Sequence, residues 1–180
     1  MNTQDRLKEA SDRTIEIYTH VGYLSTHFAG LELTLLKLTA KLTNPGEPEH
    51  EETNLSQLSF SQTVKKFKEN AKKLLPDSEA VTKAKVLAKR LLKAASDRND
   101  IIHSSWIAYT KGDYGQHPAR AKKEQKLATQ VHKDNPVNHI DEVTDSIDEL
   151  IFDLACFETG LRNEPPNEGM QSIGHKAASG

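Results

Sequence analysis

No proline interrupts the chain between Thr3 and Thr43, and this segment constrains the fold more than any other. Apolar or small side chains recur in it at three- and four-residue intervals: Leu7, Ala10, Thr14, Tyr18, Val21, Gly22, Ser25, Phe28, Ala29, Leu35, Leu36, Thr39 and Leu42. Such spacing is typical of one face of an amphipathic α-helix. Because glycine weakens a helix, the segment is either one helix about 60 Å long or two helices with a bend at Gly22.

Three further helices are expected after this segment. Residues 44–58 contain two prolines, a glycine and four glutamates, which predicts a loop. Ser59 or Ser61 can cap a second helix, and a third helix begins at Asp77 or Ser78. Both have an apolar stripe, and lysines occupy the opposite face of the third.

The remainder of the chain predicts a hairpin and a final helix. The segments Trp106–Thr110 and Lys126–His132 are rich in aromatic and β-branched residues and are separated by turn-forming residues, which favours a small β-hairpin. Asn135-Pro136 introduces the final helix, whose outer face is strongly acidic. Four helices with short or moderate connections favour an all-α fold, an antiparallel up-and-down four-helix bundle, for residues 1–162. Residues 163–180 are expected to form a disordered tail.

The composition indicates a globular domain outside the membrane. The 180 residues are 36% hydrophobic, and the opening segment is polar where a secretory signal needs an apolar run. The longest charge-free apolar stretch, Val21 to Leu31, is too short to cross a bilayer, so we expect a cytoplasmic protein that does not bind membranes. The single cysteine, Cys156, excludes disulfide scaffolds and zinc sites built from several cysteines.

The net charge of −2 hides a strong segregation along the chain. Residues 59–133 contain 17 basic and 7 acidic side chains, whereas residues 134–180 contain 2 and 10. The positive block is either a surface that neutralises the phosphates of a polyanion or a solvated helix face that pairs with acidic neighbours. The lysines that we expect to contact RNA in the first case are Lys65, Lys66, Lys72, Lys73, Lys85 and Lys89.

The motif with the clearest chemical meaning lies at the end of the third predicted helix. It reads Arg98-Asn99-Asp100-Ile101-Ile102-His103 and resembles the Arg-x4-6-His signature of the HEPN family, in which a polar residue usually follows the arginine. The run FAGLELTLLKL, residues 28–38, is similar to part of the family's long first helix. The resemblance covers roughly residues 15–162, and its specific part is the six-residue motif.

The resemblance implies a metal-independent endoribonuclease that needs no cofactor. Arg98 would then bind the scissile phosphate, His103 would act as general acid or base, and Asn99 would orient the phosphate or the imidazole. These residue types suit the roles, because guanidinium is a permanently charged donor fork and imidazole exchanges protons near neutral pH. The family also implies a homodimer with both motifs in one cleft. It most often implies a toxin or phage-defence role, with a cognate antitoxin as a further partner.

Two other classes of function stay open. One is a non-catalytic HEPN module that binds RNA, nucleotide or a protein partner, and the other is a purely structural helical protein in which Arg98 pairs with an acid such as Asp97 or Asp100. On an ideal helix Arg98 and His103 lie about 140° apart, whereas Asn99 and His103 share a face. Either the helix loosens near His103, or a two-fold axis brings Arg98 of one protomer toward His103 of the other.

Several other polar and aromatic residues invite two interpretations each. The apolar pattern places Glu32 on the core side of the first helix, where it either orients Arg98 or His103 or reaches water at the stripe's edge. His20 and His27 share a face but have no third ligand between them, so we expect no metal site there. The aromatic residues after the motif either stack on bases or close the end of the bundle: Trp106, Tyr109 and Tyr114.

Overall fold

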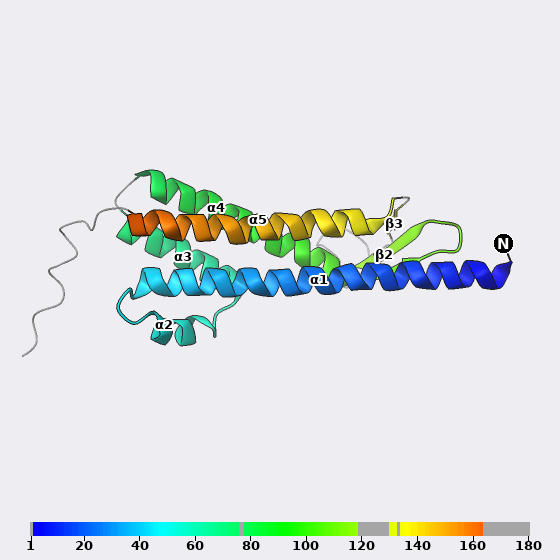
Figure 1. Ribbon diagram of the computed structural model, residues 1–180, viewed down its shortest axis with the longest axis horizontal. Coiled ribbons are helices and arrows are strands. Elements are labelled where there is room, and N and C mark those ends of the chain that lie inside the picture. Colours follow the sequence, from blue (N-terminus) through cyan, green and yellow to red (C-terminus); the bar gives the residue numbers. More distant parts are fainter. Residues whose placement is uncertain (1, 76–77, 119–129, 133, 164–180) are drawn as a thin grey trace, which may run out of the picture.

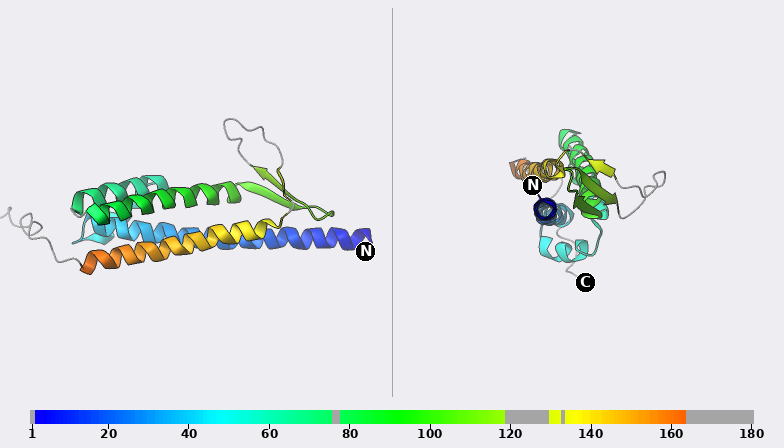
Figure 2. Two further views of the ribbon diagram at one scale, coloured as in Figure 1. Left: turned by 90° about the horizontal axis from the view of Figure 1, so that it is seen from above. Right: turned by 90° about the vertical axis from the view of Figure 1, so that its right-hand side faces the viewer.

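The computed structural model describes residues 2–75, 78–118, 130–132 and 134–163. These residues form five helices and three short strands: α1 (Thr3–Thr43), α2 (Pro48–Leu55), α3 (Phe60–Leu74), α4 (Ser78–Ile102), β1 (Ser104–Ala108), β2 (Tyr114–Pro118), β3 (Gln130–His132) and α5 (Pro136–Asn163). The four long helices lie side by side, with α1 and α5 in one layer and α3 and α4 in the other (Figure 1, Figure 2). The chain is therefore mostly helical, with a small antiparallel sheet before the last helix.

Helix α1 is a single helix that passes through Gly22 without interruption. Its first turn is held by a capping box, in which the Asn2 side chain accepts from the Asp5 backbone N–H and the Asp5 carboxylate accepts from the Asn2 N–H. Of the two expectations for this segment, one continuous helix is confirmed. The N-terminal end of α1 extends beyond the other helices (Figure 1).

Helices α1 and α3 run in the same direction. The ring of Phe28 lies 5.0 Å from that of Phe60 at the start of α3, and near the other end the Asn70 amide donates to Thr43 Oγ1 over 2.7 Å. The predicted up-and-down arrangement, with each helix reversing the one before, is therefore wrong for this pair. The reason is the connection between them, which returns alongside α1 before α3 begins.

Helix α5 also runs parallel to α1. His20 and Lys41, near opposite ends of their shared length, pair with Asp141 and Glu158 in the same order along α5. Of the four long helices that the structure describes, α4 alone runs against the other three (Figure 2). The first and last helices of the domain, α1 and α5, thus pack in parallel along their shared length.

The connection between α1 and α3 contains a helix where the sequence predicts a loop. Helix α2 starts with Pro48 in its first turn, where the missing N–H costs no hydrogen bond. It is anchored by Leu55, which is buried. The prolines and glutamates of residues 44–58 therefore start a short helix instead of preventing one.

The hairpin is confirmed, but its second strand lies elsewhere than predicted. β1 pairs with β2, with Trp106 opposite Gln116, so β2 occupies the segment expected to form the turn. The turn is tighter and closes at Gly112, whose φ of +97° favours glycine. The end of the predicted second strand is β3, and it pairs with β2 instead of β1.

The starts of the other helices are confirmed. Ser59 caps α3, its side chain accepting from Gln62 N and the Gln62 side chain accepting from Ser59 N. Asn135 Oδ1 accepts from Val137 N at the start of α5. The predicted tail lies, apart from Asn163, outside the described residues. Among the helices that the structure describes, none has the length and apolarity that crossing a membrane requires.

The core is one cluster between the two layers, and Phe67 lies at its centre. Its side chain is 0% exposed, and its ring packs edge-on against Phe157 at 5.7 Å. We predict that Phe67→Ala lowers the free energy of unfolding by about 3–5 kcal/mol, because the cavity cannot close between three helices. Urea denaturation followed by circular dichroism measures this. Phe152→Ala is the matched control, since Phe152 is 67% exposed and its truncation should change stability by less than about 0.5 kcal/mol.

Candidate functional site

Arg98 lies on the side of α4 that faces α1. Its guanidinium carbon is 4.8 Å from the centroid of the Phe28 ring, and Nη1 donates to the Asn99 side-chain oxygen over 2.9 Å. Its Nε is buried without a hydrogen-bond partner. Among the described residues Arg98 has no carboxylate partner, and Asp97 instead pairs with Lys93 on the preceding turn. The interpretation of Arg98 as half of an ion pair with Asp97 is therefore wrong.

The end of α4 is fixed by hydrogen bonds from the sheet. Ser104 Oγ donates to the Asp100 carbonyl over 2.6 Å, and the Trp106 indole N–H donates to the Ile101 carbonyl over 3.1 Å. The Gln116 amide of β2 donates to Ser104 Oγ over 3.0 Å. These donors satisfy carbonyls that a helix end leaves unpaired. Helix changes to strand within one residue, and that residue is His103.

Arg98 and His103 do not meet within one chain. The His103 side chain is exposed at the junction of α4 and β1, whereas Arg98 is half-buried against Phe28. The two side chains form no hydrogen bond with each other in the described structure. Asn99 is exposed and contacts Arg98, so it joins only one member of the pair. The helix remains regular up to Ile102. Loosening of the helix near His103, one of the two ways in which Arg98 and His103 could come together, therefore does not occur.

The sequence pattern placed Glu32 on the core side of α1, and this placement is wrong; of the two interpretations, the structure agrees with the one in which Glu32 reaches water. Its side chain is exposed, and it lines an open groove of about 290 Å³ with Leu33, Leu36 and Leu55. Among the described residues it pairs with neither Arg98 nor His103. The error arises from Ala29, which the apolar pattern assigned to the core and which is exposed.

The six lysines of the predicted RNA surface are all exposed on α3 and α4. Lys65 has Glu69 at 4.0 Å, and the other five have no carboxylate partner among the described residues. The acidic face of α5 pairs with other cations, such as Arg90 with Asp153 and Lys41 with Glu158. The positive block therefore pairs with the acidic block through Arg90, whereas five of the six lysines have no carboxylate partner in the part of the chain that the structure describes.

Sequence reasoning missed a pair of histidine–aspartate contacts between α1 and α5. His20 Nδ1 lies 2.6 Å from Asp141 Oδ1, and His27 Nδ1 lies 2.6 Å from Asp148 Oδ1. The signal was present, since the histidines and the aspartates are each seven residues apart. In the part of the chain that the structure describes, no three His, Cys, Asp or Glu side chains gather as a metal site. The pairs fix the register of the two parallel helices.

The aromatic residues after the motif pack against the N-terminal half of α1. Trp106 and Tyr114 are buried, and Tyr109 is at the margin of exposure. Arg13 stacks over the Tyr114 ring at 5.3 Å and donates to the carbonyl oxygens of Tyr109 and Gly112. Trp106 and Tyr114 therefore close the end of the helical core and do not stack on bases. Of these three aromatic residues, only Tyr109 remains available to a ligand.

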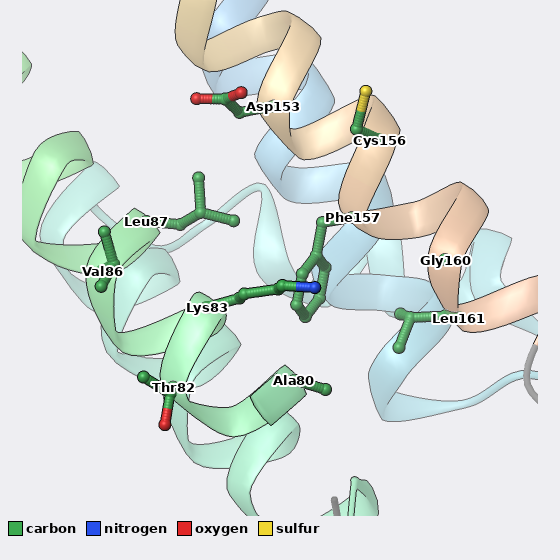
Figure 3. Close-up of a pocket in the computed structure, with 10 residues that line it drawn as sticks. All are labelled: Ala80, Thr82, Lys83, Val86, Leu87, Asp153, Cys156, Phe157, Gly160 and Leu161. Atoms are coloured by element: carbon green, nitrogen blue, oxygen red, sulfur yellow. The ribbon is translucent and has the colours of Figure 1, made fainter. Parts of the chain in front are cut away.

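A larger groove lies far from the motif. It measures about 420 Å³ and opens between the first turns of α4 and the last turns of α5, where Leu87, Phe157 and Leu161 line it and Lys83 extends from α4 (Figure 3). Ala80, at this end of α4, is 23 residues from His103, which corresponds to about 35 Å of helix. The groove is therefore separate from the candidate site.

Comparison with family models, with curated proteins and with solved structures finds no match to this chain. The candidate site consequently rests on its own geometry.

Because Arg98 forms no ion pair with any residue that the structure describes, we predict that Arg98→Met changes the free energy of unfolding by less than about 1 kcal/mol. The methionine keeps an unbranched apolar chain over Phe28. Leu91→Ala, on the same helix and 0% exposed at Leu91, should cost about 2–5 kcal/mol and shows that the urea assay is sensitive. A loss above about 2 kcal/mol for Arg98→Met would assign Arg98 a structural role.

Proposed function

We propose that the chain is a HEPN-type, metal-independent endoribonuclease that works as a homodimer. The observation that carries the proposal is an arginine, Arg98, with no carboxylate partner among the described residues, followed five residues later by an exposed histidine at the end of α4. A cation held in place by an aromatic ring keeps donors free for a phosphate. The unpaired lysines on α3 and α4 supply a surface for the rest of an RNA strand.

The proposed reaction is attack of a ribose 2′-hydroxyl on the adjacent phosphorus. The 2′-oxygen–phosphorus bond forms and the phosphorus–5′-oxygen bond breaks, which leaves a 2′,3′-cyclic phosphate and a 5′-hydroxyl. His103 takes the proton of the 2′-hydroxyl or returns one to the leaving 5′-oxygen. Arg98 stabilises the charge that develops on the phosphate, and Asn99 orients the guanidinium through its side-chain oxygen.

The different surroundings of these two groups support a dimer. Arg98 packs on Phe28 of α1 and His103 is exposed, and the two side chains form no hydrogen bond with each other in the described structure. A two-fold axis near the end of α4 would bring Arg98 of one protomer toward His103 of the other. A toxin or phage-defence effector, neutralised by a cognate antitoxin, is the biological setting that fits such an activity.

The alternative is a non-catalytic HEPN module that binds RNA, nucleotide or a protein partner. It is favoured by the same unpaired guanidinium, which can clamp a phosphate without any proton transfer. The two candidates differ only in whether His103 performs chemistry, so the histidine decides between them.

We predict that His103→Ala abolishes cleavage and leaves RNA affinity within about threefold, because the imidazole transfers protons and the cations bind the phosphates. Arg98→Ala should reduce both cleavage and affinity. Gel assays of a labelled RNA and filter binding measure the two properties on the same samples. Binding by the wild-type protein without any cleavage would support the non-catalytic module instead.

The products test the mechanism directly. We expect a 2′,3′-cyclic phosphate and a 5′-hydroxyl, unchanged rates in EDTA, and resistance of a substrate with 2′-deoxyribose at the scissile nucleotide, since the attacking group is the substrate's own hydroxyl. Mass spectrometry of the fragments identifies the ends. A 3′-hydroxyl with a 5′-phosphate would falsify this mechanism.

We further predict that reversing four lysines together, Lys66, Lys73, Lys85 and Lys89, to glutamate weakens RNA binding at least about 100-fold and flattens its salt dependence. The bundle should still fold, because all four side chains are exposed. Lys111→Glu, in the hairpin turn, is the control and should change affinity little. Equal affinity for the fourfold variant and the wild type would mean that the lysines are only a solvated surface.

A further inference from the structure

The small sheet has one face toward the core and one face toward solvent. It continues from the end of α4 (Figure 2). In β1 the residues at positions 104, 106 and 108 are buried, whereas Ser105 and Ile107 between them are exposed. His103 directly before the strand and Tyr109 directly after it are exposed as well, so exposed side chains recur at every second residue. The candidate histidine therefore stands at the start of the solvent face of the sheet.

Tyr109 lies over Gly115 of β2 on this face. A Cβ at Gly115 would be 2.6 Å from Tyr109 Oη and 3.0 Å from its Cζ and Cε2, so any side chain there would displace the ring. Backbone conformation does not explain the glycine, because among the glycines that the structure describes only Gly112 has a positive φ. Gly115 therefore makes room for the ring of Tyr109.

The backbone of Tyr109 is fixed, although its side chain is partly exposed. Its N–H donates to the Asp113 carbonyl over 2.8 Å, and its carbonyl oxygen accepts from Gly112 N–H over 3.1 Å. The same carbonyl oxygen accepts from Arg13 Nη2 over 2.6 Å, which ties this residue to α1. An aromatic side chain on a fixed backbone loses little conformational entropy when a ligand covers it.

Ile107 lies at the same level of the sheet as this ring. It is 44% exposed and is paired with Gly115 across the two strands. Ile107 is four residues from His103, which corresponds to about 13 Å of extended strand. We call Ile107, Tyr109 and Gly115 the sheet platform. None of the three carries a charge, in contrast to the lysines on α3 and α4.

We infer that the sheet platform stacks an unpaired base of a nucleotide that flanks the scissile phosphate, an inference that rests on the proposed function. Bases have apolar faces that stack on aromatic side chains, and exposed aromatic residues on small sheets bind RNA in this way. A base inside a duplex is already paired and stacked, so it cannot lie on the platform. The lysines bind phosphates of either form of RNA, and the platform adds selection for unpaired bases.

A probe that cannot be cut tests the platform separately from the ribonuclease. We choose a labelled single-stranded DNA of about 12 nucleotides, which lacks the attacking 2′-hydroxyl, and measure binding by fluorescence anisotropy. Tyr109→Ala should weaken binding about 10-fold without changing its salt dependence, because stacking releases no counterions. Tyr109→Phe should bind like the wild type. Tyr23→Ala is the matched control, since Tyr23 is a 59% exposed tyrosine of α1.

The same probe annealed to its complement tests the selection for unpaired bases. Tyr109→Ala and the wild type should bind this duplex equally. A loss of the same size for duplex and single strand would overturn stacking and leave Tyr109 as a residue that only covers Gly115 and stabilises the hairpin.

Gly115→Ala tests the contact between the glycine and the ring. Its new Cβ displaces the ring, so this variant should bind the single strand as weakly as Tyr109→Ala. The double variant should be no weaker than either, because both changes remove the same stacking surface. Additive losses would overturn the assignment of Gly115 to the platform.

An abasic probe needs no variant of the protein. A strand of the same length without bases keeps every phosphate, and the wild type should bind it about 10-fold more weakly than the complete strand. Equal binding of the two strands by the wild type would overturn the platform, whether or not the variants fold.

Cleavage assays separate this inference from the proposed function. Binding that depends on Tyr109, in a protein that cuts no RNA, would leave the platform standing and refute the ribonuclease. Cleavage that depends on His103 and is unchanged in rate and position by Tyr109→Ala would keep the ribonuclease and refute the platform.

Discussion

Packing of the buried side of α1 against the other long helices is the interaction on which the rest of the structure depends. The residues Ile17, Leu24, Leu31 and Leu35 are each 0% exposed and belong to one apolar cluster with α3, α4 and α5. Burial of side chains of this size stabilises a fold by about 1.5–3 kcal/mol each. The polar contacts to α5, such as His20 with Asp141, lie at the border of this cluster and fix which turn of α1 lies against which turn of α5.

The position of the candidate site follows from where this packing ends. Arg98 is the last cation of α4 before the helix stops, and its guanidinium covers Phe28, itself part of the core of α1. One turn later Ser104 and Trp106 satisfy the end of α4 and lead the chain into the sheet. The arginine is consequently held against the core while His103 is left at the surface.

Most helices could be predicted, because each is marked by local signals that act within a few residues. Ser59 with Gln62 and Asn135 before Pro136 are examples in which the cap predicted is the cap formed. The hairpin was harder, since Gly112 makes a tight turn possible inside a segment whose composition favours a long one. Of the candidate site, the position of Arg98 and His103 at a helix end was predictable, whereas the sequence left open whether Glu32 supports the motif or reaches water.

The sequence by itself determined that Thr3–Thr43 is helical and amphipathic, that α4 ends at the motif, and that basic and acidic residues are concentrated in different segments of the chain. Only the tertiary structure decided which apolar stripe of α1 is the inner one. Periodicity shows that a stripe exists, but Ala29 and Leu31 satisfy it equally well, and only the partner helices bury one and expose the other. The same holds for helix direction, because α2 returns the chain through contacts that no local signal encodes.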